Sequence, residues 1–274
     1  MQNPLRFLFI ADVIGSPGRK VAKGLLRLLR REENADVVIL NGENSAGGFG
    51  ITPEIVREFL ELGVDVITTG NHVWDKKEIR PLLDSEPRLL RPANYPPGNP
   101  GRGITVIEAR GVRVAVLNLQ GRIFMPPIDD PFRMADELLA SVKGDASIAV
   151  VDFHAEATSE KQAMAFYLDG RVAAVVGTHT HVQTADERIL PKGTAAITDL
   201  GLTGSIGGII GMKPEISIER QLLQARGERM QPADDELHLQ GVVVEVDTAR
   251  GVATSIKRLS VPYARALEGA FGKS

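Results

Sequence analysis

Short apolar runs that end in polar residues alternate with helical patterns over the first part of this sequence. The runs have the length of buried strands and cover residues 6–11, 36–40 and 64–68. Apolar residues recur at helical spacing from Val21 to Leu29, and residues 52–54 (TPE) have the composition of a helix start. The order strand, helix, strand, helix, strand predicts parallel strands in an α/β fold.

The rest of the chain adds strands and helices, and we expect a single domain over residues 1–274. Residues 103–108 and 112–119 are predicted to form a hairpin. Two helices and two strands follow, with the helices at 131–142 and 158–168 and the strands at 147–153 and 172–176. Three later strands, in a more antiparallel half, are expected at 195–199, 238–246 and 252–259.

The composition excludes several classes of protein. The net charge is −3 with a pI of about 6.0, so the chain has no basic field to hold duplex nucleic acid. The absence of cysteine leaves His, Asp, Glu and Asn as metal ligands, which suit Mn, Fe, Zn or Mg. No apolar run is long enough to span a membrane, so we expect a soluble cytoplasmic protein. Formation of a homo-oligomer stays open.

Side chains that can bind metals follow directly after five of the predicted strands. Four of the five histidines in the chain stand at these strand ends. Because ligands bind outside the carboxyl ends of strands in open α/β sheets, we expect these side chains to meet. They could hold two metal ions, with Glu43 as the bridging carboxylate. The candidates are Asp12, Glu43, Asn44, Asn71, His72, His154, His179 and His181.

The strand end at residues 69–75 suggests two separate roles. Asn71 can bind a metal through its amide oxygen while His72 points elsewhere and moves a proton. An ordinary turn explains the same residues, since Gly and Asn tolerate left-handed backbone. Asp75 either orients His72 or caps a helix, and the cap is the preferred interpretation.

Two glycine-rich segments have simple explanations. Residues 15–18 precede a helix but match neither the dinucleotide-binding spacing nor the P-loop spacing, so we expect a tight turn. Residues 201–211 could form a mobile lid over the site, and a plain surface loop explains their composition equally well.

Further polar residues near the strand ends are weaker candidates. Arg122, Phe124 and Met125 could help to hold a phosphate or a base, and core packing explains the last two equally well. Asp152 and Glu156 could orient the histidine between them, although acidic residues beside a strand end are more often solvated.

The order of these motifs resembles that of the calcineurin-like metallophosphoesterase superfamily. The motifs are Asp12, NGEN at 41–44, GNH at 70–72, His154 and GTHTH at 177–181. The superfamily usually has a histidine where this chain has Ile14, and Gly-Asp where it has Glu43 and Asn44. Both departures resemble the bacterial YmdB-like phosphodiesterase branch, as do NLQGR at 118–122 and HAEATSEK at 154–161.

The resemblance implies a four-layer α/β sandwich of two mixed sheets that hydrolyses phosphodiesters, including 2′,3′-cyclic nucleotides. It implies one metal ion on Asp12, Glu43, Asn44 and His181, and a second on Glu43, Asn71, His154 and His179. Without a histidine at position 14 the first site is richer in oxygen, which favours Fe or Mn over Zn or Mg. A metal-bridging hydroxide would attack phosphorus, and His72 would donate a proton to the leaving alkoxide.

Two other functions stay open on the sequence alone. A phosphomonoesterase would use the same metal pair. A non-catalytic regulatory protein would bind metal or nucleotide without turning the nucleotide over, and the exposed histidine would then have no purpose. The relative hydrolysis of bis- and mono-nitrophenyl phosphate distinguishes these functions.

Overall fold

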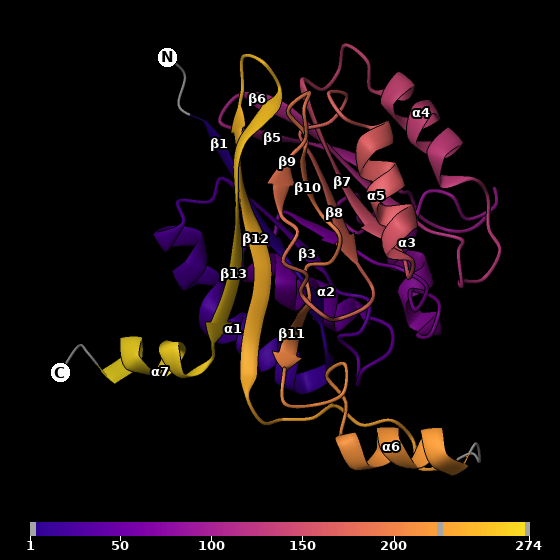
Figure 1. Ribbon diagram of the computed structural model, residues 1–274, viewed down its shortest axis with the longest axis vertical. Coiled ribbons are helices and arrows are strands. Elements are labelled where there is room, and N and C mark those ends of the chain that lie inside the picture. Colours follow the sequence, from indigo (N-terminus) through magenta and orange to yellow (C-terminus); the bar gives the residue numbers. More distant parts are fainter. Residues whose placement is uncertain (1–3, 224–226, 272–274) are drawn as a thin grey trace.

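Two mixed β-sheets form the centre of the computed structural model, which describes residues 4–223 and 227–271 (Figure 1). The first sheet has the strand order β2-β11-β12-β1-β3-β4, and β13 pairs with β12. Its strands are β1 (Leu5–Ile10), β2 (Asp12–Val13), β3 (Val37–Asn41), β4 (Val66–Thr68), β11 (Leu202–Ser205), β12 (Leu237–Asp247) and β13 (Val252–Pro262). Strands β1, β3 and β4 are parallel, as predicted, and β12 is antiparallel to β1 and β13.

The second sheet has the strand order β5-β6-β7-β8-β10-β9. Its strands are β5 (Ile104–Ala109), β6 (Val112–Gln120), β7 (Ile148–His154), β8 (Ala174–Thr178), β9 (Arg188–Ile189) and β10 (Ala195–Ile197). The predicted hairpin of β5 and β6 is confirmed. Strands β6, β7, β8 and β10 are parallel, so the carboxyl ends of β7 and β8 lie at the same edge of this sheet.

Helices cover the outer faces of both sheets and complete four layers. The helices of the described residues are α1 (Gly15–Glu32), α2 (Pro53–Glu61), η1 (Lys77–Ile79), α3 (Arg80–Ser85), α4 (Pro131–Ser141), α5 (Thr158–Tyr167), α6 (Pro214–Leu223) and α7 (Ala264–Phe271). Helices α1 and α2 pack on the first sheet, and α4 and α5 pack on the second. Within residues 4–223 and 227–271, no helix is long and apolar enough to cross a membrane.

The alternation of side chains along β1 shows how the layers are held together. Phe7 and Phe9 point into the core between the two sheets, whereas Leu8 and Ile10 point into the core under α1 and α2. All four side chains are buried, and each contributes about 1.5–3 kcal/mol by leaving water. The four-layer sandwich of two mixed sheets predicted from the sequence is confirmed.

Some local expectations are wrong. In the glycine-rich segment 201–211, residues 202–205 form β11, buried between β2 and β12, so the expectation of a loop is wrong for these residues. A lid formed by residues 206–211 stays a prediction. Pairing with both neighbours overrides the low strand propensity of glycine. Strand β10 pairs in parallel with β8 on one side and antiparallel with β9 on the other, so the expected antiparallel pairing is only partly present there. The sequence analysis does not predict the short helices α3, α6 and α7.

Candidate metal centre

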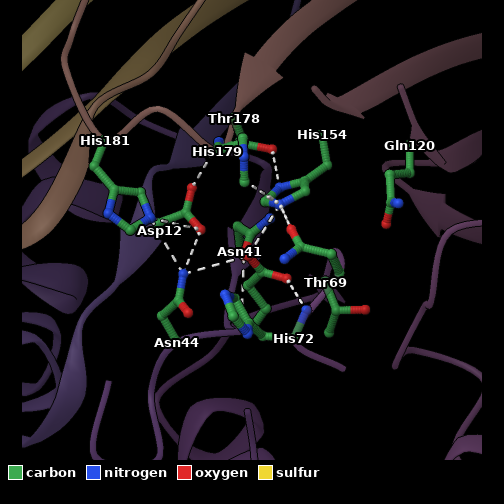
Figure 2. A network of polar contacts seen from close by, with 12 residues as sticks. Asp12, Asn41, Asn44, Thr69, His72, Gln120, His154, Thr178, His179 and His181 are labelled. Carbon is green, nitrogen blue, oxygen red and sulfur yellow. Dashed lines mark hydrogen bonds and ion pairs between the residues drawn. The ribbon is translucent and has the colours of Figure 1, made fainter. Parts of the chain in front are cut away.

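The candidate ligands lie at neighbouring strand ends of the two sheets, where they face one another (Figure 2). Asp12 begins β2, and Glu43 and Asn44 follow β3. Asn71 follows β4, His154 ends β7, and the two remaining histidines follow β8. Asp12, Glu43 and His154 are all fully buried. The structure therefore brings together all seven side chains that the sequence analysis selected as ligands: Asp12, Glu43, Asn44, Asn71, His154, His179 and His181.

In one group of ligand atoms, three atoms surround the Nε2 atom of His154. Glu43 Oε1 lies 2.9 Å from this nitrogen, and Asn71 Oδ1 lies 3.0 Å from it. His179 Nδ1 lies 3.1 Å from the same nitrogen. The ligand atoms of Glu43, His154 and His179 lie within 4.8 Å of one another, a spacing at which one ion can bind all three.

A second group of ligand atoms surrounds the Asn44 amide. Its Nδ2 atom lies 3.2 Å from Asp12 Oδ1, 3.2 Å from His181 Nε2 and 3.3 Å from Glu43 Oε1. Rotating the Asn44 amide by 180° exchanges its nitrogen and oxygen atoms. The oxygen then occupies the position of Nδ2, where it can bind a cation. Glu43 Oε1 belongs to both groups, so this one carboxylate oxygen can bridge two ions.

Each of the three histidines in the centre directs one ring nitrogen inward, because an acceptor holds its other ring nitrogen. His181 and His179 have single acceptors, and His154 has a longer chain of partners. His181 Nδ1–H donates to the carbonyl oxygen of Ile210 at 3.0 Å. His179 Nε2–H donates to Glu156 Oε2 at 3.1 Å. Such partners fix the tautomer and ring orientation of metal-binding histidines.

The orientation of His154 depends on a buried chain of hydrogen bonds. Its Nδ1–H donates to Thr178 Oγ1 at 2.9 Å, and the Thr178 hydroxyl donates to Asp152 Oδ1 at 2.7 Å. Thr68 donates to the other carboxylate oxygen. Burial raises the pKa of Asp152 to about 6 although these hydroxyl groups oppose the rise. The expectation that Asp152 is solvated is wrong, since it is 3% exposed.

The charges of the centre are strongly coupled. Burial alone would raise the pKa of Asp12, but the hydrogen bond and charge of His181 lower this pKa to about 2. Burial opposes protonation of His181, and Asp12 nonetheless raises its pKa to about 9. Burial and the charge of His154 lower the pKa of His179 to about 3. At neutral pH Asp12 is therefore ionised and His179 is neutral, whereas a cation would have to displace the proton of His181 in order to bind it.

The backbone of this centre is tightly constrained. His179 and His181 both have positive φ, at 105° and 62°, a conformation that costs on the order of 1–3 kcal/mol at each residue. At Gly70, a Cβ atom would overlap His154 Nε2 and would lie 2.5 Å from Glu43 Oε2. Only glycine fits there, because the backbone passes directly beside the ligand atoms.

A buried ion pair supports the segment that carries the last two histidines. Lys161 Nζ lies 2.7 Å from Asp199 Oδ2, and both side chains are buried. The same oxygen accepts hydrogen bonds from the backbone N–H and the hydroxyl group of Thr180. Thr180 stands between His179 and His181, so the ion pair holds this segment in place.

We expect Lys161→Met to lower the free energy of unfolding by about 3–5 kcal/mol, because it leaves the Asp199 carboxylate buried without its cation. Urea unfolding followed by circular dichroism measures the loss. The matched control is Lys143→Met at an exposed lysine. Combining Lys161→Met with Asp199→Asn is expected to recover part of the loss. A stability change below about 0.5 kcal/mol, the usual size for surface substitutions, would show that the ion pair does not support the segment.

His72 lies beside the ligands without joining them. Its backbone N–H donates to Glu43 Oε2 at 3.0 Å, and its ring Nδ1 lies 2.9 Å from Asp75 Oδ2. The preferred interpretation of Asp75 as a helix cap is wrong, since Lys76 is the N-cap residue of η1. Asp75 instead contacts Nδ1 of the His72 ring, and this contact does not involve Nε2.

A pocket of about 310 Å³ opens onto the centre. One part is polar and contains the ligands and His72, and another part is apolar. The lining residues are Glu43, Asn44, Gly48, Phe49, His72, Glu156, His179, Thr180, His181, Ile210, Met212 and Met230. Of the apolar residues, only Ile210 belongs to a segment that the sequence marked as a possible cover of the site. Phe49, Met212 and Met230 share no motif that indicates a pocket.

The weaker candidates of the segment after β6 lie outside this pocket. Arg122 pairs with Asp130 at 2.9 Å. Phe124 is 89% exposed, so core packing does not explain it. Neither these residues nor Met125 lines the pocket.

The two-sheet sandwich is the metallophosphoesterase fold, and its strand-end cluster includes Glu43, His154 and His179, which could hold a metal ion. At the level of fold, the 5′-nucleotidase precursor of Thermus thermophilus has a TM-score of 0.58 and 14% identity, with 97% of this chain and 58% of that chain covered. Within this class the chain belongs to the YmdB-like protein family, whose sequence pattern matches residues 8–259.

Two relatives cover nearly the whole chain. The 2′,3′-cyclic-nucleotide 2′-phosphodiesterase of Bacillus subtilis (strain 168) is 51% identical over 257 residues, which are 94% of this chain and 97% of the relative. The crystal structure of a novel phosphatase from Mycoplasma pneumoniae has a TM-score of 0.88 at 36% identity and covers 98% of both chains.

Proposed function

We propose that this chain is a dinuclear metal-dependent phosphodiesterase that hydrolyses small phosphodiesters, with 2′,3′-cyclic nucleotides as the substrate class. The main support is Glu43 Oε1, which lies 2.9 Å from His154 Nε2 and 3.3 Å from Asn44 Nδ2 and so is common to both groups of ligand atoms. In this proposal Asp12, Glu43, Asn44 and His181 hold one ion, and Glu43, Asn71, His154 and His179 hold the other.

The donor set fits cations. Two fully buried carboxylates, Asp12 and Glu43, have only histidines as ion-pair partners among the described residues. Buried charges need such compensation, and a pair of cations supplies it. Bound ions polarise the phosphate and lower the pKa of water so that a nucleophile exists at neutral pH. Ile14 contributes no nitrogen to the first site, so we propose Fe or Mn there.

His72 acts as the proton donor in this proposal. Asp75 binds Nδ1 of the ring, and His72 also lines the pocket beside Glu43. The ring can therefore donate a proton to the leaving oxygen of a phosphodiester. Because the backbone N–H of His72 donates to Glu43, the proton donor and the shared carboxylate keep a fixed relative position.

The pocket favours a diester over a monoester. No lysine or arginine is among the lining residues of the described chain, and the carboxylate of Glu156 lies at the wall. A phosphomonoester carries roughly −1.5 to −2 charge at neutral pH, whereas a diester carries one negative charge. The Glu156 carboxylate repels the monoester more strongly than the diester, which disfavours the rival monoesterase function.

Hydrolysis of two nitrophenyl esters tests the proposal. With Mn added, we expect kcat/KM for bis-p-nitrophenyl phosphate to exceed that for p-nitrophenyl phosphate by at least about tenfold, a difference of about 1.4 kcal/mol in the barrier. A preference for the monoester would instead support a phosphatase, the activity named for the Mycoplasma pneumoniae relative. Hydrolysis of neither ester would support a regulatory metal-binding protein.

Analysis of the metals tests the finer part of the proposal. Protein purified without added metal is expected to contain Fe or Mn at about two ions per chain. A stoichiometric pair of zinc ions with full activity would contradict the preference for Fe or Mn. The proposal places the reaction in the cytoplasm.

A further inference from the structure

The part of the pocket beside the proposed metal ligands is an apolar wall, formed by Phe49, Ile210, Met212 and Met230. These residues come from the segment after β3, the segment after β11 and the segment before β12. Ile210 is 47% exposed, whereas Met212 is buried beneath the surface of the wall. An apolar surface of this kind has no use in binding phosphate or metal, so it requires a separate explanation.

The wall is built on a small hydrophobic cluster of its own. Ile14, Leu202 and Met212 form its buried base, and Phe49 and Met230 pack against them. Ile14 therefore supports the wall and offers no ligand atom to the neighbouring metal centre.

Close contacts fix the position of the apolar wall relative to the metal centre. A Cβ atom at Gly48 would lie 2.9 Å from Met212 Cε, so the segment before Phe49 approaches Met212 closely. The carbonyl oxygen of Ile210 accepts the hydrogen bond of the proposed ligand His181. Since the wall and the ligand share this bond, a substrate can contact both without any rearrangement of the protein.

We propose that this apolar wall binds the base of a nucleotide substrate, an inference that rests on the proposed phosphodiesterase function. A phosphate at the metal ligands leaves the base of the same nucleotide to occupy the remaining part of the pocket. The Phe49 ring stands at the boundary, with its centroid 5.0 Å from that of His72. Aromatic and methionine side chains bind the flat face of a base by stacking and dispersion.

The chemistry of the wall also predicts how the bases are distinguished. Phe49, Ile210, Met212 and Met230 carry no side-chain donor or acceptor apart from weak thioether sulfur. Discrimination between bases depends on hydrogen bonds to their edges, which this wall does not offer. The kcat/KM values of the four 2′,3′-cyclic nucleotides are therefore expected to lie within about tenfold of each other, with purines preferred for their larger stacking area.

The test compares a substrate with a base to one without. Adenosine 2′,3′-cyclic phosphate and glycerol 1,2-cyclic phosphate share the five-membered cyclic diester, and only the first has a base. We expect Phe49→Ala to lower the ratio of their kcat/KM values by about tenfold, and Phe49→Trp to restore it. Damage to the neighbouring His72 would affect both substrates alike and leave the ratio unchanged. Phe124→Ala is the matched control, because that ring is exposed outside the pocket.

A binding measurement separates this inference from the proposed function. Saturation-transfer NMR with adenosine is expected to show contact at the base protons in the wild type and loss of this contact in Phe49→Ala. Hydrolysis of both diesters without adenosine contact would overturn the base site alone. Contact of adenosine with the wall, without hydrolysis of either cyclic diester, would support the base site and refute the proposed phosphodiesterase function. A ratio that stays within about twofold in Phe49→Ala, or a preference above about a hundredfold for one base, would also overturn the inference.

Discussion

Glu43→Gln is expected to remove both metal ions and to lower kcat/KM for bis-p-nitrophenyl phosphate by at least about a thousandfold, since several kcal/mol of charge stabilisation are lost. The reason is the position of one oxygen atom. Glu43 Oε1 faces His154 in one ligand group and Asn44 in the other. Glutamine has nearly the same shape but carries no charge, and its amide can place hydrogens where the cations bind.

Metal content and activity must fall together in this experiment. Plasma emission spectroscopy of the purified variant measures Fe, Mn and Zn, and circular dichroism checks that the fold is intact. The matched control is Glu108→Gln, because Glu108 is exposed on β5 and lies outside the pocket. Retention of two ions per chain by Glu43→Gln would show that this carboxylate does not bridge them. Retention of one ion would assign Glu43 to a single site.

The architecture could be predicted because its signals are local. Each run such as residues 6–11 is apolar, short and bounded by polar residues, and each helix between the runs has one apolar face. Strand β11 could not be predicted, since its residues form a strand only because β2 and β12 lie on both sides. The pairing partners stand far away in the sequence, and the glycine content of the segment indicates a loop.

The metal ligands could be predicted for a similar reason. The residues that line the pocket or hold the ligand segments in place could not. Asp12 and His154 follow apolar runs directly, and parallel strands bring such residues to one edge. Phe49 and Met230 meet only through the cluster that includes Ile14. Nothing in the local sequence of these residues indicates a pocket. Lys161 stands in the segment 154–161 that the sequence marks, but its ion pair with Asp199 forms only in the folded chain.

A second large effect is expected for His72→Ala, and its size depends on the leaving group. A ribose alkoxide must gain a proton as it departs, so hydrolysis of a 2′,3′-cyclic nucleotide should slow by about 10²–10⁴-fold. Nitrophenolate is a stable anion and leaves without a proton. We therefore expect a much smaller loss with bis-p-nitrophenyl phosphate, measured as kcat under saturating substrate.

The contrast between the two substrates separates proton donation from a structural role. His72 contributes only its backbone N–H to Glu43, and alanine keeps this bond, so both metal ions should remain bound. Asp75→Asn keeps a side chain beside Nδ1 but removes the carboxylate that holds the ring, and a smaller loss with the same dependence on the leaving group is expected. Equal losses on both substrates, or loss of metal, would exclude His72 as the proton donor, because a missing proton can slow only the substrate that needs it.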